Sequence, residues 1–168
     1  MLILNTKVDS IAAIDGELLL PFELREKSRL RARLVSGEEV GVFTVRGSVL
    51  RGGDLLRGDD GRVVRIVAAP EATYRVSCAN PDALLRCAFH LGNRHTQAEV
   101  GAGFLRIRRD PVLKDMLLGL GASVDEEQAP FEPESGAYGG GHHHHGDGNV
   151  LAPVPLRQKI HRPSDSPP

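Results

Sequence analysis

The sequence predicts an α+β protein in three parts. Residues 1–72 are expected to be rich in β-strand, residues 73–135 to mix strands with helices, and residues 136–168 to form a disordered tail. Three observations support this division. Short apolar runs separated by glycine and aspartate fill the first part, helical apolar spacing appears in the second, and glycine and proline dominate the third, where large apolar residues are few.

The first part contains four stretches with strand character. They lie at residues 2–4, 29–35, 40–45 and 62–69. Turns such as "RGDDG" between them indicate a small antiparallel sandwich or barrel. The arginines of "RLRARL" alternate with apolar or small residues, so we interpret them as the solvent face of a half-buried strand rather than as a nucleic-acid site.

Helix signals begin after a strand-like stretch, "ATYRVSC". Asn80 suits the N-cap, Pro81 the first helical position and Gly92 the C-terminal stop, so a helix is predicted over residues 81–92. Four small or apolar side chains recur on one face at helical spacing and are expected to pack inward: Leu84, Cys87, Ala88 and Leu91.

The alternation of strands and helices continues to the end of this part. The expected elements are a strand over residues 98–109, a helix over residues 110–121 that ends at glycine, and a strand over residues 122–131. Together with the preceding elements they give strand–helix–strand–helix–strand. This pattern is typical of a ferredoxin-like fold if one segment also contains a hidden edge strand.

Composition and charge argue against several classes of protein. The net charge is −1 with acids and bases interleaved, which disfavours a nucleic-acid partner. No apolar run approaches the roughly 20 residues that a membrane span requires. The two cysteines do not make a disulfide framework, so we expect a reducing, cytoplasmic location without membrane attachment.

The sequence does not predict an enzyme. "RGGDLLRG" lacks the lysine of a phosphate-binding loop, and neither G-x-S-x-G nor H-E-x-x-H occurs. The acids of "VDEEQ" could form a carboxylate pair, but a solvated strand or turn is the simpler interpretation. Cys87 and His90 could form half of a zinc site, yet Cys78 alone does not supply the second pair of ligands, so we expect both cysteines in the core.

Histidine is the residue whose placement points to a function. His142, His143, His144 and His145 are consecutive and flanked by glycines, and neutral imidazole is a good ligand for Ni²⁺, Cu²⁺ and Zn²⁺. A purification tag is the alternative, but tags usually carry longer runs at a terminus, and here residues 146–168 follow. His161 is a weaker additional candidate.

His95 lies three residues beyond the expected helix end, in the polar turn "NRHTQ", and should be exposed. A lone exposed histidine is usually not a ligand. In a two-fold dimer, however, a residue near the axis meets its own copy, so two rings could converge on one ion and tail imidazoles could complete the site. His90, at the end of the helix, is a weaker candidate that could orient His95 or cover the edge of the core.

Five stretches resemble the UreE family of urease accessory proteins. They occur in the family's order over most of residues 20–145: "REKSRLRARL", "RGSVLRGGDLL", "HLGNRHTQAE", "DPVLKDMLLGLG" and "PFEPESGAYGGGHHHH". "GNRH" and the junction before the histidine run are the most diagnostic. In some members a histidine follows the aspartate of "DPVL", where this chain has Pro111, so any secondary metal site that depends on it should be weaker or absent.

The resemblance implies a nickel metallochaperone that is not itself an enzyme. It implies an N-terminal domain like the peptide-binding region of a heat-shock co-chaperone and a ferredoxin-like domain that forms a homodimer. His95 of each chain would bind nickel across the dimer axis, with the histidines of residues 142–145 as an additional segment. The ion is cargo, passed to apo-urease within an assembly that contains an accessory GTPase. Whether dimers pair further into a metal-bridged tetramer stays open.

Two alternatives remain beside the nickel carrier. One is a protein-interaction chaperone of urease maturation, or a general divalent-metal buffer, for which nickel binding is incidental. The other, a metallohydrolase, would need a fixed three-ligand site and a nearby base, and the sequence shows neither. Because Cu²⁺ and Zn²⁺ bind imidazole well, both should compete in vitro. Imidazole binds metal only when neutral, so affinity should fall below about pH 6.5.

Overall fold

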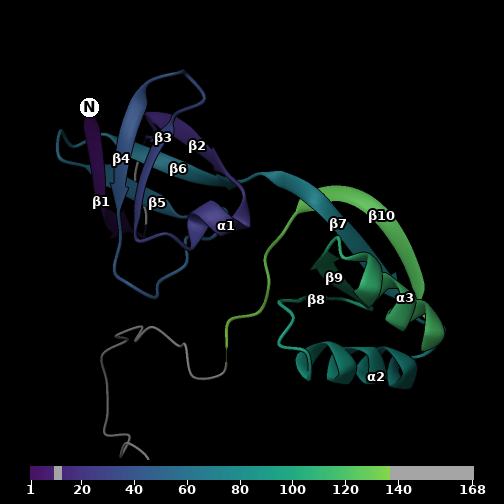
Figure 1. Ribbon diagram of the computed structural model, residues 1–168. Coiled ribbons are helices and arrows are strands. Elements are labelled where there is room, and N and C mark those ends of the chain that lie inside the picture. Colours follow the sequence, from purple (N-terminus) through teal and green to yellow (C-terminus); the bar gives the residue numbers. More distant parts are fainter. Residues whose placement is uncertain (10–12, 137–168) are drawn as a thin grey trace, which may run out of the picture.

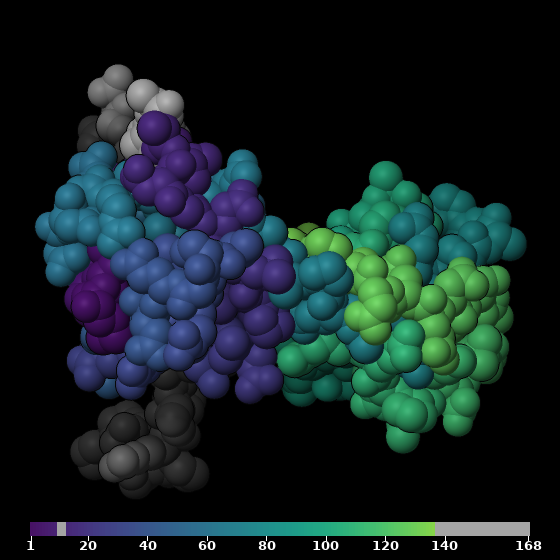
Figure 2. All heavy atoms as spheres, turned by 90° about the horizontal axis from the view of Figure 1, so that it is seen from above, coloured from purple at the N-terminus to yellow at the C-terminus, as the bar shows by residue number. Residues whose placement is uncertain are grey.

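The computed structural model describes residues 1–9 and 13–136, which form two sheets with three helices (Figure 1). The chain passes from the first sheet to the second between Ala68 and Pro70. Figure 2 shows two lobes, one for each sheet, that meet across a narrower region. The predicted α+β fold class is confirmed. Within the described part of the chain, no helix is long and apolar enough to cross a membrane.

The N-terminal sheet has six strands in the order β2-β6-β5-β1-β4-β3. The strands are β1 (Leu2–Val8), β2 (Gly16–Leu20), β3 (Arg29–Arg33), β4 (Glu39–Phe43), β5 (Leu55–Gly58) and β6 (Val63–Ala68), and the short helix α1 (Phe22–Arg25) follows β2. The Val35 N–H donates to the Glu17 carbonyl at 2.9 Å, so the two edges of the sheet approach each other and give it a barrel-like shape.

The expectation of a purely antiparallel N-terminal sheet is wrong, because β1 pairs with β4 and β2 with β6 in parallel. The turns that the sequence reveals join neighbours along the chain, such as β5 and β6, and such short connections give antiparallel pairs. The parallel partners are far apart in sequence, and no local signal specifies their direction.

Alternating apolar residues fill the inside of this sheet. In β2, Leu18 and Leu20 are buried whereas Leu19 is exposed. Leu4 of β1 and Ile66 of β6 are also fully buried in the same cluster. In β3 the arginines are exposed, as predicted for its solvent face, and Arg31 and Arg33 both pair with Glu39 of β4.

The C-terminal sheet has four antiparallel strands in the order β10-β7-β9-β8. The strands are β7 (Pro70–Ser77), β8 (Glu99–Gly101), β9 (Phe104–Arg108) and β10 (Ser123–Pro130), with helices α2 (Pro81–Gly92) and α3 (Pro111–Gly119) between them. In chain order this is a βαββαβ unit, so the ferredoxin-like prediction is confirmed. The hidden strand is β8, which Gly103, at φ 80°, separates from β9.

Both helices pack against one apolar cluster on this sheet. Cys87 and Leu91 of α2 are buried, and Leu84 and Ala88 pack beside them, as the helical spacing predicts. Burying a leucine side chain such as Leu91 contributes about 2 kcal/mol. This packing fixes the direction of α2 and therefore the position of the turn that follows it.

Candidate metal site

His95 lies on the turn that ends α2, and its side chain is exposed as predicted. Its N–H donates to the Gly92 carbonyl at 2.9 Å, and the next N–H, of Thr96, donates to the Leu91 carbonyl at 3.2 Å. These two bonds are the Schellman arrangement, which satisfies the last carbonyl groups of a helix. His95 is therefore held by the backbone of a packed helix rather than by a loose loop.

The helix stops where the sequence predicts, but the residue that turns the chain is not Gly92. His95 has a φ of 53° and is the only non-glycine residue with positive φ in the described ranges. α3 ends with the same pair of hydrogen bonds and uses Gly121, at φ 83°, in the equivalent position. A side chain in this left-handed region costs about 1 kcal/mol, a cost that glycine avoids. The fold thus places a histidine where local energetics favour glycine.

A polar cavity of 660 Å³ opens beside His95, between the two sheets. Glu23 and Glu26 line it from the N-terminal side, and Arg94 and Arg108 from the C-terminal side. Gln97 joins the two sides, because its amide N–H donates to Glu26 at 3.1 Å and its amide oxygen accepts from Arg108 at 2.9 Å. His95 is therefore exposed to a solvent-filled space with charges of both signs.

One chain does not offer a complete metal site in its described residues. Residues 1–9 and 13–136 contain no cluster of three or more histidine, cysteine, aspartate or glutamate side chains that could hold an ion. A single imidazole binds a divalent ion weakly, so His95 would need further ligands from a second chain or from residues outside the described ranges.

His90 occupies a different environment from His95. It is half-buried in the last turn of α2, and its ring lies edge-on to Phe89 with 5.5 Å between the ring centroids. Its carbonyl accepts from the Arg94 guanidinium at 3.1 Å. In the part of the chain that the structure describes, no hydrogen bond joins the side chains of His90 and His95. A role for His90 in metal binding stays a prediction.

The other candidates divide into two groups. His142, His143, His144, His145 and His161 lie outside the described residues. Cys78, directly after β7, and Cys87, in the middle of α2, lie side by side with 3.8 Å between their sulfur atoms, and Cys87 is fully buried. Among the residues described, no third ligand joins the two thiols, so half of a zinc site is not completed.

After β10, residues 131–136, which we call the return segment, run between the two sheets (Figure 1). Its Glu132 N–H donates to the Glu99 carboxylate and its Glu134 N–H to the Ala98 carbonyl, both at 2.9 Å. The segment that leads to the histidine run therefore starts within a few residues of His95. Pro111, the departure noted in the sequence, is exposed in the first turn of α3.

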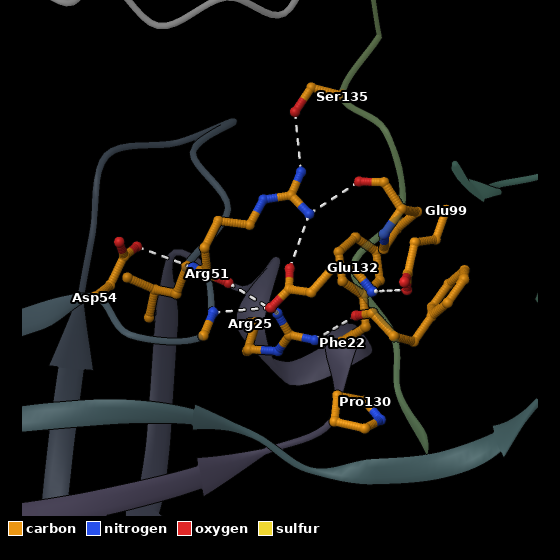
Figure 3. A network of polar contacts seen from close by, with 12 residues as sticks. Phe22, Arg25, Arg51, Asp54, Glu99, Pro130, Glu132 and Ser135 are labelled. Atoms are coloured by element: carbon orange, nitrogen blue, oxygen red, sulfur yellow. Dashed lines mark hydrogen bonds and ion pairs between the residues drawn. The ribbon is translucent and has the colours of Figure 1, made fainter. Parts of the chain in front are cut away.

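Arg25 of α1 anchors the return segment to the N-terminal sheet (Figure 3). This arginine is fully buried, and its guanidinium donates to the Phe131 carbonyl at 2.6 Å and to the Glu132 carboxylate at 2.7 Å. The carbonyls of Leu20 and Leu50 accept two further bonds. These hydrogen bonds compensate for the burial of the charge. Through them, the Arg25 side chain links the N-terminal sheet to the residues that follow the last strand of the C-terminal sheet.

Glu132 completes this network. Besides Arg25, its carboxylate accepts from the Arg51 guanidinium at 3.0 Å and from the Gly52 N–H at 2.8 Å. Burial opposes ionisation of this carboxyl, but the hydrogen bonds from Gly52, Arg51 and Arg25 outweigh burial and lower the pKa of Glu132 below its ordinary value. Sequence analysis missed this role of Arg25, because an arginine in a polar stretch usually faces water.

α2 also presents an apolar surface away from its core face. Leu85 is 68% exposed and Phe89, one turn later, is 64% exposed. Residues four apart lie on the same face of a helix, so the two side chains form one patch. A contact that covered this patch would remove both side chains from water.

Two family models match the chain along most of its length. The N-terminal domain of the UreE urease accessory protein matches residues 4–69, and the C-terminal domain of the same protein matches residues 71–155. The chain belongs to the UreE family. The boundary between the two matches coincides with the passage from β6 to β7.

Several UreE relatives are similar over nearly their whole length. The chain is 72% identical to the urease accessory protein UreE of Janthinobacterium sp. (strain Marseille), over 98% of each chain. It is 66% identical to that of Nitrosospira multiformis, over 99% of each chain. With the protein of the same name from Burkholderia vietnamiensis the identity is 52%, over 90% of this chain and 76% of the relative.

Proposed function

We propose that this protein is a cytoplasmic nickel metallochaperone. It binds Ni²⁺ through histidines at a homodimer interface and delivers the ion to apo-urease during assembly of the metal centre. The observation that carries the proposal is His95, an exposed imidazole on a packed turn at a backbone position that favours glycine. The relatives are named as accessory proteins of urease. That name fits a carrier that catalyses no covalent reaction itself.

A dimer would supply the second ligand. The described part of one chain holds no complete metal cluster, whereas a two-fold axis near His95 would bring two imidazoles to one ion. The apolar patch of Leu85 and Phe89 lies on the helix that leads directly to His95. We propose that this patch contributes to the dimer contact and so places the two turns opposite each other.

The histidine run would supply further ligands. From Glu134, anchored at Ala98, to His142 the chain has eight residues and can extend to at most about 28 Å. Ala98 is only three residues from His95, so this length of chain would allow the rings of residues 142–145 to reach the site. These residues would capture the ion and pass it to the His95 pair by ligand exchange. Imidazole-only coordination would then permit release to a partner.

Delivery requires partners beyond the dimer. The proposed recipients are the urease apoprotein and an assembly that includes the accessory GTPase, with no role for nucleic acid or membrane. Nickel is the cargo, and Cu²⁺ or Zn²⁺ should compete for the same imidazoles in vitro.

Nickel titration calorimetry at neutral pH tests this proposal on four proteins. They are the intact chain, a chain that ends at Tyr138, His95→Ala and the matched control His90→Ala. We expect truncation to lower the stoichiometry but to keep one tight site per dimer, and His95→Ala to remove that site while His90→Ala retains it. Equally tight binding by His95→Ala would refute the bridged site.

A second candidate function has its own supporting observation. The pairing of β1 with β4 stops at Leu4, and beyond it a cavity of 180 Å³ lies between the two strands, lined in part by the apolar residues Phe43 and Val45. An extended segment of a client protein could pair with the strand ends that are left apart at this cavity. Substitutions confined to this cavity that abolish urease maturation but leave nickel binding intact would favour the client-holding function.

A further inference from the structure

We propose that Cys78 and Cys87 form a reversible intramolecular disulfide, which makes the start of α2 a redox-sensitive modification site. This inference does not depend on nickel binding. It starts from the positions of the two thiols, which are the only cysteines in the chain. Cys78 directly follows β7, Cys87 lies in the middle of α2, and their sulfur atoms are 3.8 Å apart.

The local structure holds the two thiols together. The chain between them contains the N-cap of α2, where the Asn80 side chain accepts from the Ala83 N–H at 2.9 Å. Cys87 also packs in the same apolar cluster as Val76 of β7, so both ends of the connection are fixed. A disulfide has a sulfur–sulfur distance of about 2.05 Å, so the sulfurs must approach by roughly 1.8 Å, a distance within the range of side-chain rotation.

A metal site at this pair is the competing explanation. Two thiolates on one tetrahedral zinc ion, each at about 2.3 Å, would also lie about 3.8 Å apart. Zinc needs four ligands, however, and the described residues offer no third ligand beside the pair. Oxidation to a neutral disulfide suits a buried apolar site better.

The difference in exposure of the two thiols sets the order of reaction. Cys78 is half-buried and can meet a small oxidant, whereas Cys87 is fully buried. The Cys78 thiolate would attack one sulfur of a small disulfide such as oxidised glutathione, and the other half would leave as a thiol after taking up a proton. Cys87 would then lose its proton and attack the Cys78 sulfur, which releases the second thiol. Two protein thiols are oxidised, and one small disulfide is reduced to two thiols.

The bond would tie the first half of α2 to the end of β7. α2 carries the patch of Leu85 and Phe89 and leads to the turn of His95. Oxidation should therefore slow amide hydrogen exchange in α2 and raise the thermal midpoint, because the closed ring restricts the unfolded chain.

The test uses the full chain, freed of metal and equilibrated with mixtures of reduced and oxidised glutathione. Free thiols are then blocked with N-ethylmaleimide, and the intact mass is measured. We expect each chain to lack two hydrogen atoms, to carry no covalent link to a second chain, to take up no maleimide and to yield one cross-linked peptide containing Cys78 and Cys87. In urea the same oxidation should need a mixture at least about tenfold more oxidising, because the native fold holds the thiols together.

Matched variants keep the result specific. Cys87→Ser should give only a mixed disulfide of Cys78 with glutathione, and Cys78→Ser should leave Cys87 largely unreacted until the protein unfolds. The proposal would be overturned if the native chain took up two maleimide groups, and so had no disulfide, in a glutathione mixture that oxidises the unfolded chain in urea. So would a disulfide between chains, or a stoichiometric zinc ion that Cys87→Ser removes.

Discussion

At the scale of single residues, His95 in the turn after α2 carries a conformational cost, and its proposed role in metal binding is separate from the stability of the turn. His95 and Gly121 occupy the same position in the two helix ends, with the same pair of backbone hydrogen bonds. Glycine is the residue that this backbone conformation favours, so the histidine is not explained by the stability of the turn. A role of the imidazole in binding a metal ion would explain why histidine occupies this position.

Substitution of His95 should therefore affect stability and metal binding in different ways. We expect His95→Gly to be more stable than His95→Ala by about 1 kcal/mol, because glycine adopts positive φ without strain. Both variants should lose tight nickel binding. Urea unfolding and nickel titration on the same samples measure the two effects, and Gly121→Ala, which should lose about 1 kcal/mol, is the control. Equal stability of the two His95 variants would argue against strain at this position.

At the scale of elements, the sequence predicts structure correctly where the signal is local. The N-cap, the first-turn proline and the apolar spacing of α2 all lie within a few residues of one another, and each is found where predicted. β2 was missed because Leu18, Leu19 and Leu20 are consecutive and show no period-two alternation, and β5 because it lies within the glycine-rich stretch "RGGDLLRG". The parallel pairs of the N-terminal sheet and the buried Arg25 depend on distant partners, which no local pattern encodes.

The outer patch of α2 leads to a prediction about the dimer. The double substitution Leu85→Ser and Phe89→Ser should weaken self-association by at least about tenfold, because it removes two apolar side chains from the proposed contact. The fold should be retained, since both side chains are exposed in the single chain. Sedimentation equilibrium gives the dimer constant, with Val112→Ser on α3, 76% exposed, as the control. A control that dissociates the dimer as strongly would place the interface elsewhere.

At the scale of the whole molecule, the return segment joins the two sheets. Arg25 and Arg51 belong to the N-terminal side, and Glu132 follows the last strand of the C-terminal sheet. The division of the chain at residues 72 and 135 stays a prediction, and the network around Glu132 argues that any such units unfold together. Limited proteolysis of the intact chain and of Glu132→Ala would show whether cleavage between the sheets depends on this contact.

Removing the carboxylate should be costly. Glu132→Ala leaves the buried Arg25 charge without its only acidic partner among the described residues, and we expect a loss of about 3 kcal/mol in the free energy of unfolding. Glu39→Ala, which removes exposed pairs with Arg31 and Arg33, should cost much less, because solvent screens exposed pairs. Urea denaturation of both variants measures this difference. Similar losses in the free energy of unfolding would show that the buried pair stabilises the fold no more than the exposed pairs do.

The same carboxylate predicts a dependence on pH. Since the pKa of Glu132 is lowered in the folded protein, its ionised form is favoured by folding. Its contribution is therefore present above the unfolded-state pKa, about 4.3, and is lost as the pH falls through the lower folded-state value. The stability difference between the natural protein and Glu132→Gln should shrink as the pH falls from neutral to about 3. A difference that grows on acidification would contradict the direction of the shift.

In the proposed dimer, one nickel ion is held by the His95 side chains of the two chains. Nickel K-edge X-ray absorption tests this arrangement most directly, on the chain that ends at Tyr138 and loaded with one ion per dimer. We expect the multiple-scattering signature of two imidazole ligands, and its loss in the same chain with His95→Ala. A spectrum without imidazole scattering, or one that His95→Ala leaves unchanged, would contradict it.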